Sequence, residues 1–211
     1  MGQEALTQRS PAAAPAPAKM TYEQFLQWDG ENQHVEWVDE KVVFMSPVTD
    51  WHADVAGLLY TLIRHYIEHR RLGRVFCEPF QMKTGPDLPG RAPDILFVAN
   101  KNLGRLKRLY LDGPGDLVVE VISPGSRVTD RGEKFYEYEQ GGVPEYWLID
   151  PERKQAEFYQ PGKDRIYRLA QIESDGIYRS KVLAGLWLKV DWLWQAPLPT
   201  VMSVLKEWKL V

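Results

Sequence analysis

The stretch DLVVEVISP, residues 116–124, contains the segment that most clearly predicts the core of the fold. Its valines and isoleucine are typical of a buried strand. Because side chains alternate along a strand, Val118, Glu120 and Ile122 are expected to share one face. An ionised carboxylate in such a strand is costly unless a cation or hydrogen bonds compensate for it. We therefore expect another part of the chain, or a bound cation, to neutralise Glu120.

The composition indicates an ordinary globular protein. The chain has 211 residues, of which 44% are hydrophobic and 26% charged, and its net charge of −3 gives no general attraction for nucleic acid. We expect a disordered Ala/Pro-rich tail over residues 1–19 and one domain over residues 20–211. No apolar run is long enough for a membrane helix, and the single Cys77 fits a cytoplasmic protein.

Sequence periodicity and capping signals predict a mixed order of helices and strands. We expect helices over residues 22–28, from residue 50 to the HRRLG segment at 69–73, over 129–142 and at the C-terminus. We expect a hairpin over 34–45 and strands over 74–83, 94–99, 116–122, 144–150, 155–160, 165–170 and near 185–190. This order predicts an α/β or α+β fold in which helices pack around a mixed sheet.

Two acidic residues and a lysine form the pattern most indicative of chemistry. Asp94 follows a proline at the start of one expected strand, Glu120 lies within another, and Lys134 lies in the helix that follows. Magnesium is commonly held by one or two carboxylates, with waters and phosphate oxygens as the other ligands. The pattern therefore predicts a magnesium or manganese site, and such an ion would neutralise Glu120.

The same residues resemble the PD-(D/E)xK nuclease superfamily, and within it the Uma-two family of restriction endonucleases. The resemblance extends from Met20 to the C-terminal helix and is most specific in DLVVEVISPGSRVTDRGEKFYEYEQGGVPEYWLID, residues 116–150. Shorter matches occur in order at MTYEQF, VEWVDEKVVFM, around His52, at APDILFV and at LAGLWLKVDWLW. The resemblance implies a restriction-endonuclease-like fold, with a central mixed sheet flanked by helices.

By position, the resemblance assigns catalytic roles to several residues. It implies that Asp94 and Glu120 bind magnesium and that Glu36 contributes to the catalytic site. Isoleucine stands at residue 122, where the superfamily usually has lysine, and Lys134 is the residue that matches the displaced lysine. Its implied role is to activate the attacking water or to stabilise charge on the phosphate.

The resemblance further implies a magnesium-dependent endodeoxyribonuclease that hydrolyses DNA phosphodiester bonds, and it suggests a homodimer. Arg127 and Arg131 are the expected DNA-binding residues, with the basic run KNLGRLKR at 101–108 as a weaker candidate. The alternative is a catalytically inactive module of the same fold that binds nucleic acid or protein, which the isoleucine at residue 122 favours.

Structural roles compete with these functional ones. Glu120 can be a buried glutamate paired with an arginine, and Lys134 and Glu36 can be solvated. His65, Glu68 and His69 spell H-x-x-E-H, a zinc-protease motif, but they fall on the polar face of their helix. His52, at the start of that helix, is open to a packing, capping or substrate-binding role.

Overall fold

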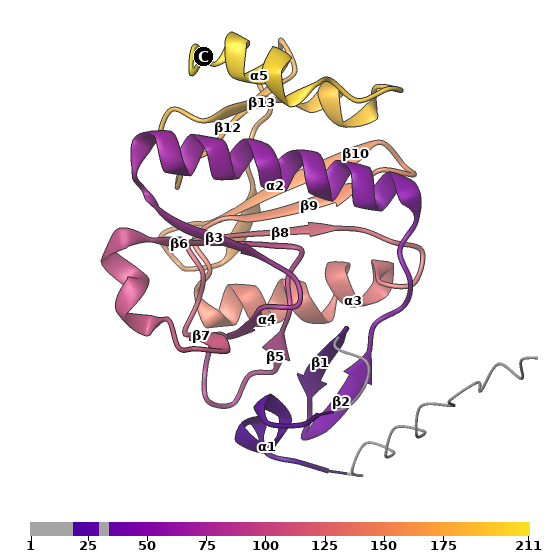
Figure 1. Ribbon diagram of the computed structural model, residues 1–211, viewed down its shortest axis with the longest axis vertical. Helices are drawn as coiled ribbons and strands as arrows, with labels where there is room; N and C mark the ends of the chain where they lie inside the picture. Colours follow the sequence, from indigo (N-terminus) through magenta and orange to yellow (C-terminus); the bar gives the residue numbers. More distant parts are fainter. Residues whose placement is uncertain (1–18, 30–33) are drawn as a thin grey trace, which may run out of the picture.

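The computed structural model describes residues 19–29 and 34–211 (Figure 1). The expected tail over residues 1–19 lies outside these ranges, apart from Lys19. The first elements are α1 (Tyr22–Leu26), β1 (Val35–Val38), β2 (Lys41–Phe44), α2 (Asp50–Arg70), β3 (Gly73–Cys77), β4 (Gln81–Lys83), β5 (Gly90–Arg91), β6 (Ile95–Ala99), the 3-10 helix η1 (Asn100–Arg105) and β7 (Tyr110–Asp112). The remaining elements are β8 (Leu117–Val121), α3 (Arg127–Arg131), α4 (Glu133–Gly141), β9 (Tyr146–Asp150), β10 (Gln155–Pro161), β11 (Tyr167–Leu169), β12 (Ile177–Arg179), β13 (Trp187–Lys189), the 3-10 helix η2 (Val190–Trp194) and α5 (Val201–Glu207).

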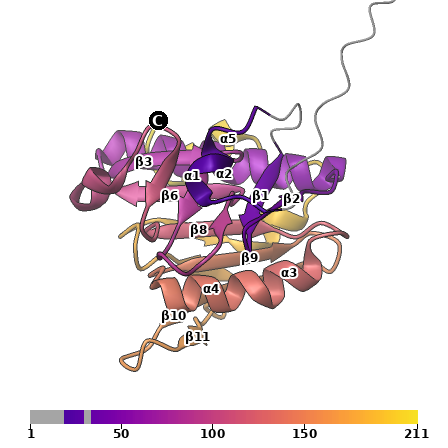
Figure 2. The ribbon, with the colours of Figure 1, turned by 90° about the horizontal axis from the view of Figure 1, so that it is seen from below.

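A six-stranded mixed sheet forms the centre of the molecule. Its strand order is β11-β10-β9-β8-β6-β3, with β8 and β9 parallel and the other neighbours antiparallel. Helix α2 covers one face, while α3 and α4 lie end to end along the other (Figures 1 and 2). This arrangement confirms the expected α/β (α+β) architecture.

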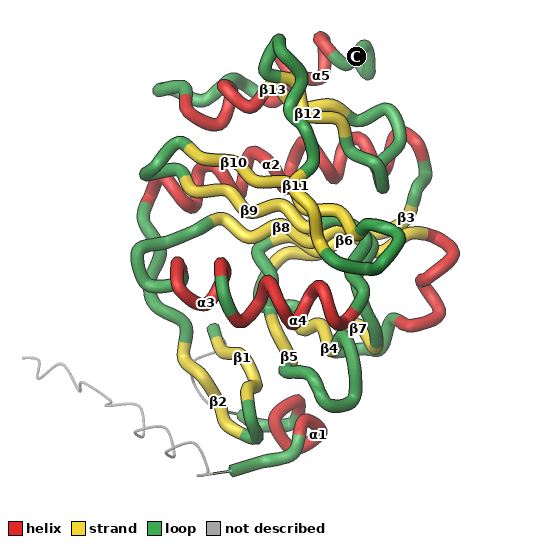
Figure 3. The backbone as a smooth tube through the Cα atoms, turned by 180° about the vertical axis from the view of Figure 1, so that it is seen from behind, coloured by secondary structure: helices red, strands yellow, loops and turns green. Residues whose placement is uncertain are grey.

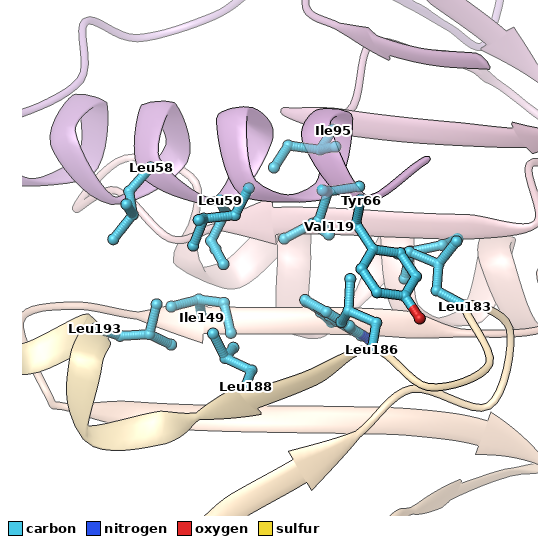
Figure 4. Close-up of a cluster of buried hydrophobic side chains, with 14 of the residues drawn as sticks. Leu58, Leu59, Tyr66, Ile95, Val119, Ile149, Leu183, Leu186, Leu188 and Leu193 are labelled. Atoms are coloured by element: carbon cyan, nitrogen blue, oxygen red, sulfur yellow. The ribbon is translucent and has the colours of Figure 1, made fainter. Parts of the chain in front are cut away.

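The two faces of β8 bear out the alternation predicted from its sequence. Val119 and Val121 belong to the core beneath α2, where Leu59 also packs (Figure 4). Val118 belongs to the core on the α4 side, together with Ile122 just beyond the strand. Glu120 shares the face of Val118 and therefore lies on the side of α3 and α4.

A second, smaller sheet has the strand order β2-β1-β5-β4-β7 and lies beside α4 (Figure 3). The β1–β2 hairpin turns through Asp39 and Glu40, both of which have positive φ. Helix α1 begins with the expected capping box between Thr21 and Gln24. A Cβ atom on Gly90 would lie 2.2 Å from the Tyr22 ring, so only glycine lets α1 pack this closely on β5.

Two sequence expectations are wrong in detail. The strand expected over residues 74–83 is two strands, because the chain turns at Glu78 and Pro79. The helix expected over residues 129–142 is broken at Gly132 into α3 and α4. Helix α2 ends at Arg70, and Arg71 caps it in the left-handed conformation.

Within the described ranges, no helix is long and apolar enough to cross a membrane.

We predict that Leu59→Ala lowers the free energy of unfolding by about 2–5 kcal/mol, because Leu59 is 1% exposed and its truncation leaves a cavity under α2. The matched control is Leu169→Ala, since Leu169 is 61% exposed and its truncation is expected to cost less than about 0.5 kcal/mol. Urea denaturation of both variants measures the difference. Equal losses would contradict the placement of Leu59 in the core.

Candidate active site

Strand pairing brings Asp94 and Glu120 to the same level of the sheet. Ile95 on β6 pairs with Val119 on β8 in antiparallel register. Continuing that register by one residue places Asp94 opposite Glu120, and both side chains line one cavity of about 160 Å³. Residues opposite each other in an antiparallel pair have Cβ atoms only about 4.5–5.5 Å apart. The two predicted metal ligands therefore meet, although they lie 26 residues apart in the chain.

The Asp94 carboxylate is held through one oxygen. Its Oδ2 accepts a hydrogen bond of 2.6 Å from the Val121 backbone N–H and lies 3.4 Å from His52 Nε2. His52 is buried at the start of α2, and its backbone N–H donates to the cap residue Thr49. Burial lowers the pKa of His52, but Asp94, Glu78 and the Val121 backbone together raise it by more, so its pKa lies above the ordinary value. His52 therefore lines the cavity beside Asp94, and the hydrogen bonds among the described residues leave Asp94 Oδ1 for a ligand.

Glu78 is a third acid beside this pair, and the sequence did not indicate it. Cys77 pairs with Ile95, so the next residue, Glu78, follows the same register toward Asp94. Glu78 lines the cavity, where burial and the neighbouring Asp94 raise its pKa. Only the pairing of β3 with β6 places Glu78 here, and strand pairing is not visible in a single sequence.

Lys134 and Tyr138 on α4 neutralise and orient Glu120. Glu120 Oε1 accepts hydrogen bonds from Lys134 Nζ at 3.1 Å and from the Tyr138 hydroxyl at 2.7 Å. Burial still raises the pKa of Glu120 well above its ordinary value, by more than the Lys134 ammonium lowers it. The cation expected for Glu120 is thus a lysine, and not an arginine, and it compensates the carboxylate only in part.

The Lys134 ammonium is shared among three carboxylates. Its Nζ lies 3.1 Å from Glu120, 3.1 Å from Asp130 and 3.3 Å from Glu36, and the side chain is 1% exposed. Burial alone lowers the pKa of Lys134, but these neighbours raise it well above the ordinary value. The lysine is therefore charged and buried in the site, which excludes the solvated role.

Glu36 is bound by protein donors on both of its oxygens. Oε2 accepts a hydrogen bond from Arg91 Nη1 at 2.8 Å, and Oε1 accepts one from the Ala92 backbone N–H at 3.2 Å and faces Lys134. Burial raises the pKa of Glu36, but Lys134 and Arg91 lower it by more. Glu36 is thus ionised and links β1 to β5 and α4, which excludes the solvent-facing alternative.

Arg127 and Arg131 do not line this cavity. Both pair with the buried Asp150 at the end of β9, at 3.3 and 3.7 Å, and each also contacts a glutamate, Glu152 or Glu157. They are about one quarter exposed and hold α3 against β9 and β10. Their role in DNA binding stays a prediction.

The H-x-x-E-H motif does not form a metal site. Its histidines are exposed on α2, His65 Nδ1 lies 2.8 Å from the Thr61 carbonyl oxygen, and Glu68 pairs with Arg64 at 2.8 Å. In the described part of the chain, no group of three His, Cys, Asp or Glu residues is arranged to hold a metal ion by itself. The zinc-protease alternative is therefore wrong.

The charges around the cavity favour a small, hard cation that takes ligands from water and phosphate as well as from the protein. Of the residues that the structure describes, six carboxylates and two permanent cations line it, namely Glu36, Glu78, Asp94, Glu120, Asp130 and Glu133 against Arg91 and Lys134. Asp94 and Glu120 each engage the protein through a single oxygen in the hydrogen bonds described above. Two such carboxylates suit magnesium, which keeps several waters and takes phosphate oxygens. The donor set therefore fits magnesium or manganese.

Comparisons with known proteins identify the family and the fold. The sequence model of the Uma2 family, described as "Putative restriction endonuclease", matches residues 22–191. No curated protein matches the chain. A crystal structure described as "a putative nuclease belonging to DUF820 from Anabaena variabilis ATCC 29413" has the same fold, with a TM-score of 0.66 at 20% sequence identity. The alignment covers 84% of this chain and 97% of that one.

We predict that Glu120→Gln makes the thermal stability of the metal-free protein less sensitive to rising pH. Because the pKa of Glu120 is raised in the folded state, the folded protein keeps a proton that the unfolded chain releases, and stability falls as pH rises. Glutamine cannot ionise, so the Tm of the variant relative to wild type should rise by a few degrees from about pH 5 to about pH 8.

Differential scanning calorimetry in EDTA measures this difference. The matched control is Glu207→Gln on α5, whose side chain is 45% exposed. A Tm difference for Glu120→Gln that stays constant with pH, as expected for the control, would show that Glu120 is already fully ionised in the folded protein.

Proposed function

Because the chain belongs to the Uma2 family of restriction-endonuclease-like proteins, we propose that it is a magnesium-dependent endonuclease that hydrolyses DNA phosphodiester bonds. The observation that carries this proposal is the meeting of Asp94 and Glu120 in one cavity, each with one oxygen engaged by protein donors. The fold shared with the Anabaena protein supports it.

Asp94 and Glu120 would hold the ion. A bound magnesium ion lowers the pKa of a coordinated water and neutralises charge on the phosphoryl oxygens. The chain's own residues fix the two carboxylates: Val121 and His52 hold Oδ2 of Asp94, and Lys134 with Tyr138 holds Oε1 of Glu120. Fixed ligands keep the reacting geometry before the substrate arrives.

Lys134 and Glu36 are buried residues that hold the proposed metal ligands in place. Lys134 is 1% exposed, and its ammonium stabilises the ionised form of Glu120. From this buried position it would also stabilise negative charge on the phosphate. Glu36 in turn holds Lys134 and Arg91. The proposed catalytic role of both residues is therefore to organise the site.

DNA is the proposed substrate because the site suits a phosphodiester and the family is described as restriction endonucleases. Phosphate contacts by Arg127 and Arg131 remain part of the proposal, and they would compete with Asp150, Glu152 and Glu157. A cytoplasmic location is proposed from the single cysteine.

One observation favours the alternative, a catalytically inactive nuclease-fold module. Ile122, at the position of the superfamily's usual lysine, is 1% exposed and packs in the core on the α4 side. If Lys134 does not supply the missing charge, the chain would bind nucleic acid or protein without cleaving it. Metal-dependent cleavage separates the two functions.

We predict that the wild-type protein nicks supercoiled plasmid in magnesium or manganese and that Asp94→Asn loses at least about 100-fold of this activity. Removing a metal ligand costs several kcal/mol of transition-state stabilisation, and about 1.4 kcal/mol corresponds to a factor of ten in rate. Gel electrophoresis of plasmid over time measures the rates.

The matched control is Asp54→Asn, since Asp54 is exposed on α2 and should retain full activity. Equal nicking by wild type and Asp94→Asn would identify a contaminating nuclease. Isothermal titration with manganese extends the test: an inactive module should give no heat of binding, whereas an enzyme should lose the signal on Glu120→Gln.

A homodimer is proposed because a duplex presents two strands related by twofold symmetry, which a symmetric pair of sites can cut together. Sedimentation velocity at micromolar concentration is expected to show a species of twice the chain mass, in a buffer containing magnesium. A single monomer boundary under those conditions would contradict the proposal.

A further inference from the structure

A second cavity of about 530 Å³ lies beside the site and shares Glu78 with it. Aromatic side chains from three parts of the chain line it: Trp28 after α1, Tyr60 on α2, and Phe76 and Phe80 on either side of the β3–β4 turn. Its volume lies within the range of about 300–1,000 Å³ that is usual for ligand-binding pockets.

Two contacts join this cavity to the one that holds Asp94 and Glu120. Glu78 lines both cavities. The ring of Trp28, which lines the second, meets that of Phe44, which lines the first, edge to face with centroids 6.2 Å apart. A ligand in the second cavity therefore lies next to any phosphate bound in the first.

Gln81 lines the second cavity, and its side chain carries a polar atom that the described residues leave unsatisfied. Its side chain is 6% exposed, and its Nε2 donates to the Val35 carbonyl at 3.0 Å and, more weakly, to the Pro79 carbonyl at 3.4 Å. These two bonds fix the orientation of the amide, so Oε1 is the remaining group. Oε1 is buried and has no hydrogen-bond partner within the described residues. A buried acceptor of this kind favours a ligand that brings an N–H donor.

The rim of the second cavity carries positive charge, unlike the acidic first cavity. Arg108 lines it and is exposed, and the exposed Arg74 lies over the ring of Phe76 at 4.8 Å. Arg108 belongs to the basic run at residues 101–108, so part of that run does reach a binding cavity. Guanidinium groups at the rim suit the phosphate backbone of a nucleic acid.

We propose that the second cavity binds an unpaired nucleobase of the substrate strand while the adjacent phosphate lies against Asp94 and Glu120. The inference rests on the proposed function and specifies its substrate as a strand with at least one base out of the duplex. The base stacks on the aromatic lining, and an N–H of its Watson–Crick edge donates to Gln81 Oε1. A planar ring with edge donors matches both features, whereas an aliphatic peptide side chain would leave Gln81 unsatisfied.

Cys77 makes this inference testable without cleavage. It is the single cysteine of the chain, it is exposed, and it lines the second cavity. We expect a short single-stranded DNA, present at saturating concentration in EDTA, to slow alkylation of Cys77 by N-ethylmaleimide about tenfold or more. The same strand with abasic residues should give little protection, because it lacks the rings that enter the cavity.

Trp28→Ala is expected to weaken binding of the single strand about tenfold by fluorescence anisotropy, in line with the loss of one stacking contact. The matched control is Tyr136→Ala, since Tyr136 is a 61% exposed aromatic residue on α4 outside the cavity. Circular dichroism of both variants establishes that they are folded. If Trp28→Ala misfolds, the alkylation measurement on the wild-type protein still decides.

The outcomes separate this inference from the proposed function. Plasmid nicking by the wild-type protein, together with equal alkylation rates with and without DNA, would overturn the proposed nucleobase site but support the proposed nuclease function. Equal protection by intact and abasic strands would also overturn it, because contact with the backbone would then suffice. Base-dependent protection without any metal-dependent nicking would support the nucleobase site and overturn the nuclease.

Discussion

The Lys134 ammonium, buried among three carboxylates, is the interaction on which the site depends. It joins Glu120 on the central sheet, Glu36 on the second sheet and Asp130 on α3. One positive charge cannot neutralise three negative ones, and among the described residues only Glu36 has a second cation, Arg91, beside it. Burial raises the pKa of all three carboxyls, and the cations outweigh it only at Glu36, so the pKa of Glu36 is lowered while those of Glu120 and Asp130 are raised. The site is organised in the protein but short of positive charge, which suits the divalent ion of the proposed function.

In the proposed function, the two cavities divide the recognition of one substrate. The first is lined with carboxylates and repels phosphate until a cation is present. The second combines aromatic rings with guanidinium groups at its rim and can hold a base without a metal. In the proposed arrangement, affinity for the strand comes from one cavity and chemistry from the other, so neither requires a basic surface over the whole molecule. A net charge of −3 is therefore compatible with a nucleic-acid substrate.

Local sequence predicted much of the fold because the relevant signals are local. The alternation in VVEVI predicted that Val119 and Glu120 lie on opposite faces of the strand, and the structure adds that the Val119 face packs under α2. Thr21 with Gln24 formed the expected capping box. The site was predictable only where a family pattern preserved its order, as for Asp94 and Glu120. Glu78 and Gln81 were missed because their positions follow from the turn between β3 and β4 and from the pairing of β3 with β6. Those pairings depend on residues far apart in the sequence.

The pairing of Arg127 and Arg131 with Asp150 has an evolutionary consequence. Asp150 ends β9 and is fully buried, yet it holds in place the short helix α3, which carries Asp130 to Lys134. Replacement of Asp150 alone would leave two guanidinium groups without their shared acceptor and loosen that helix. In related sequences, a change at Asp150 should therefore be accompanied by changes at both arginines. This covariation should be seen even among relatives that recognise different substrates.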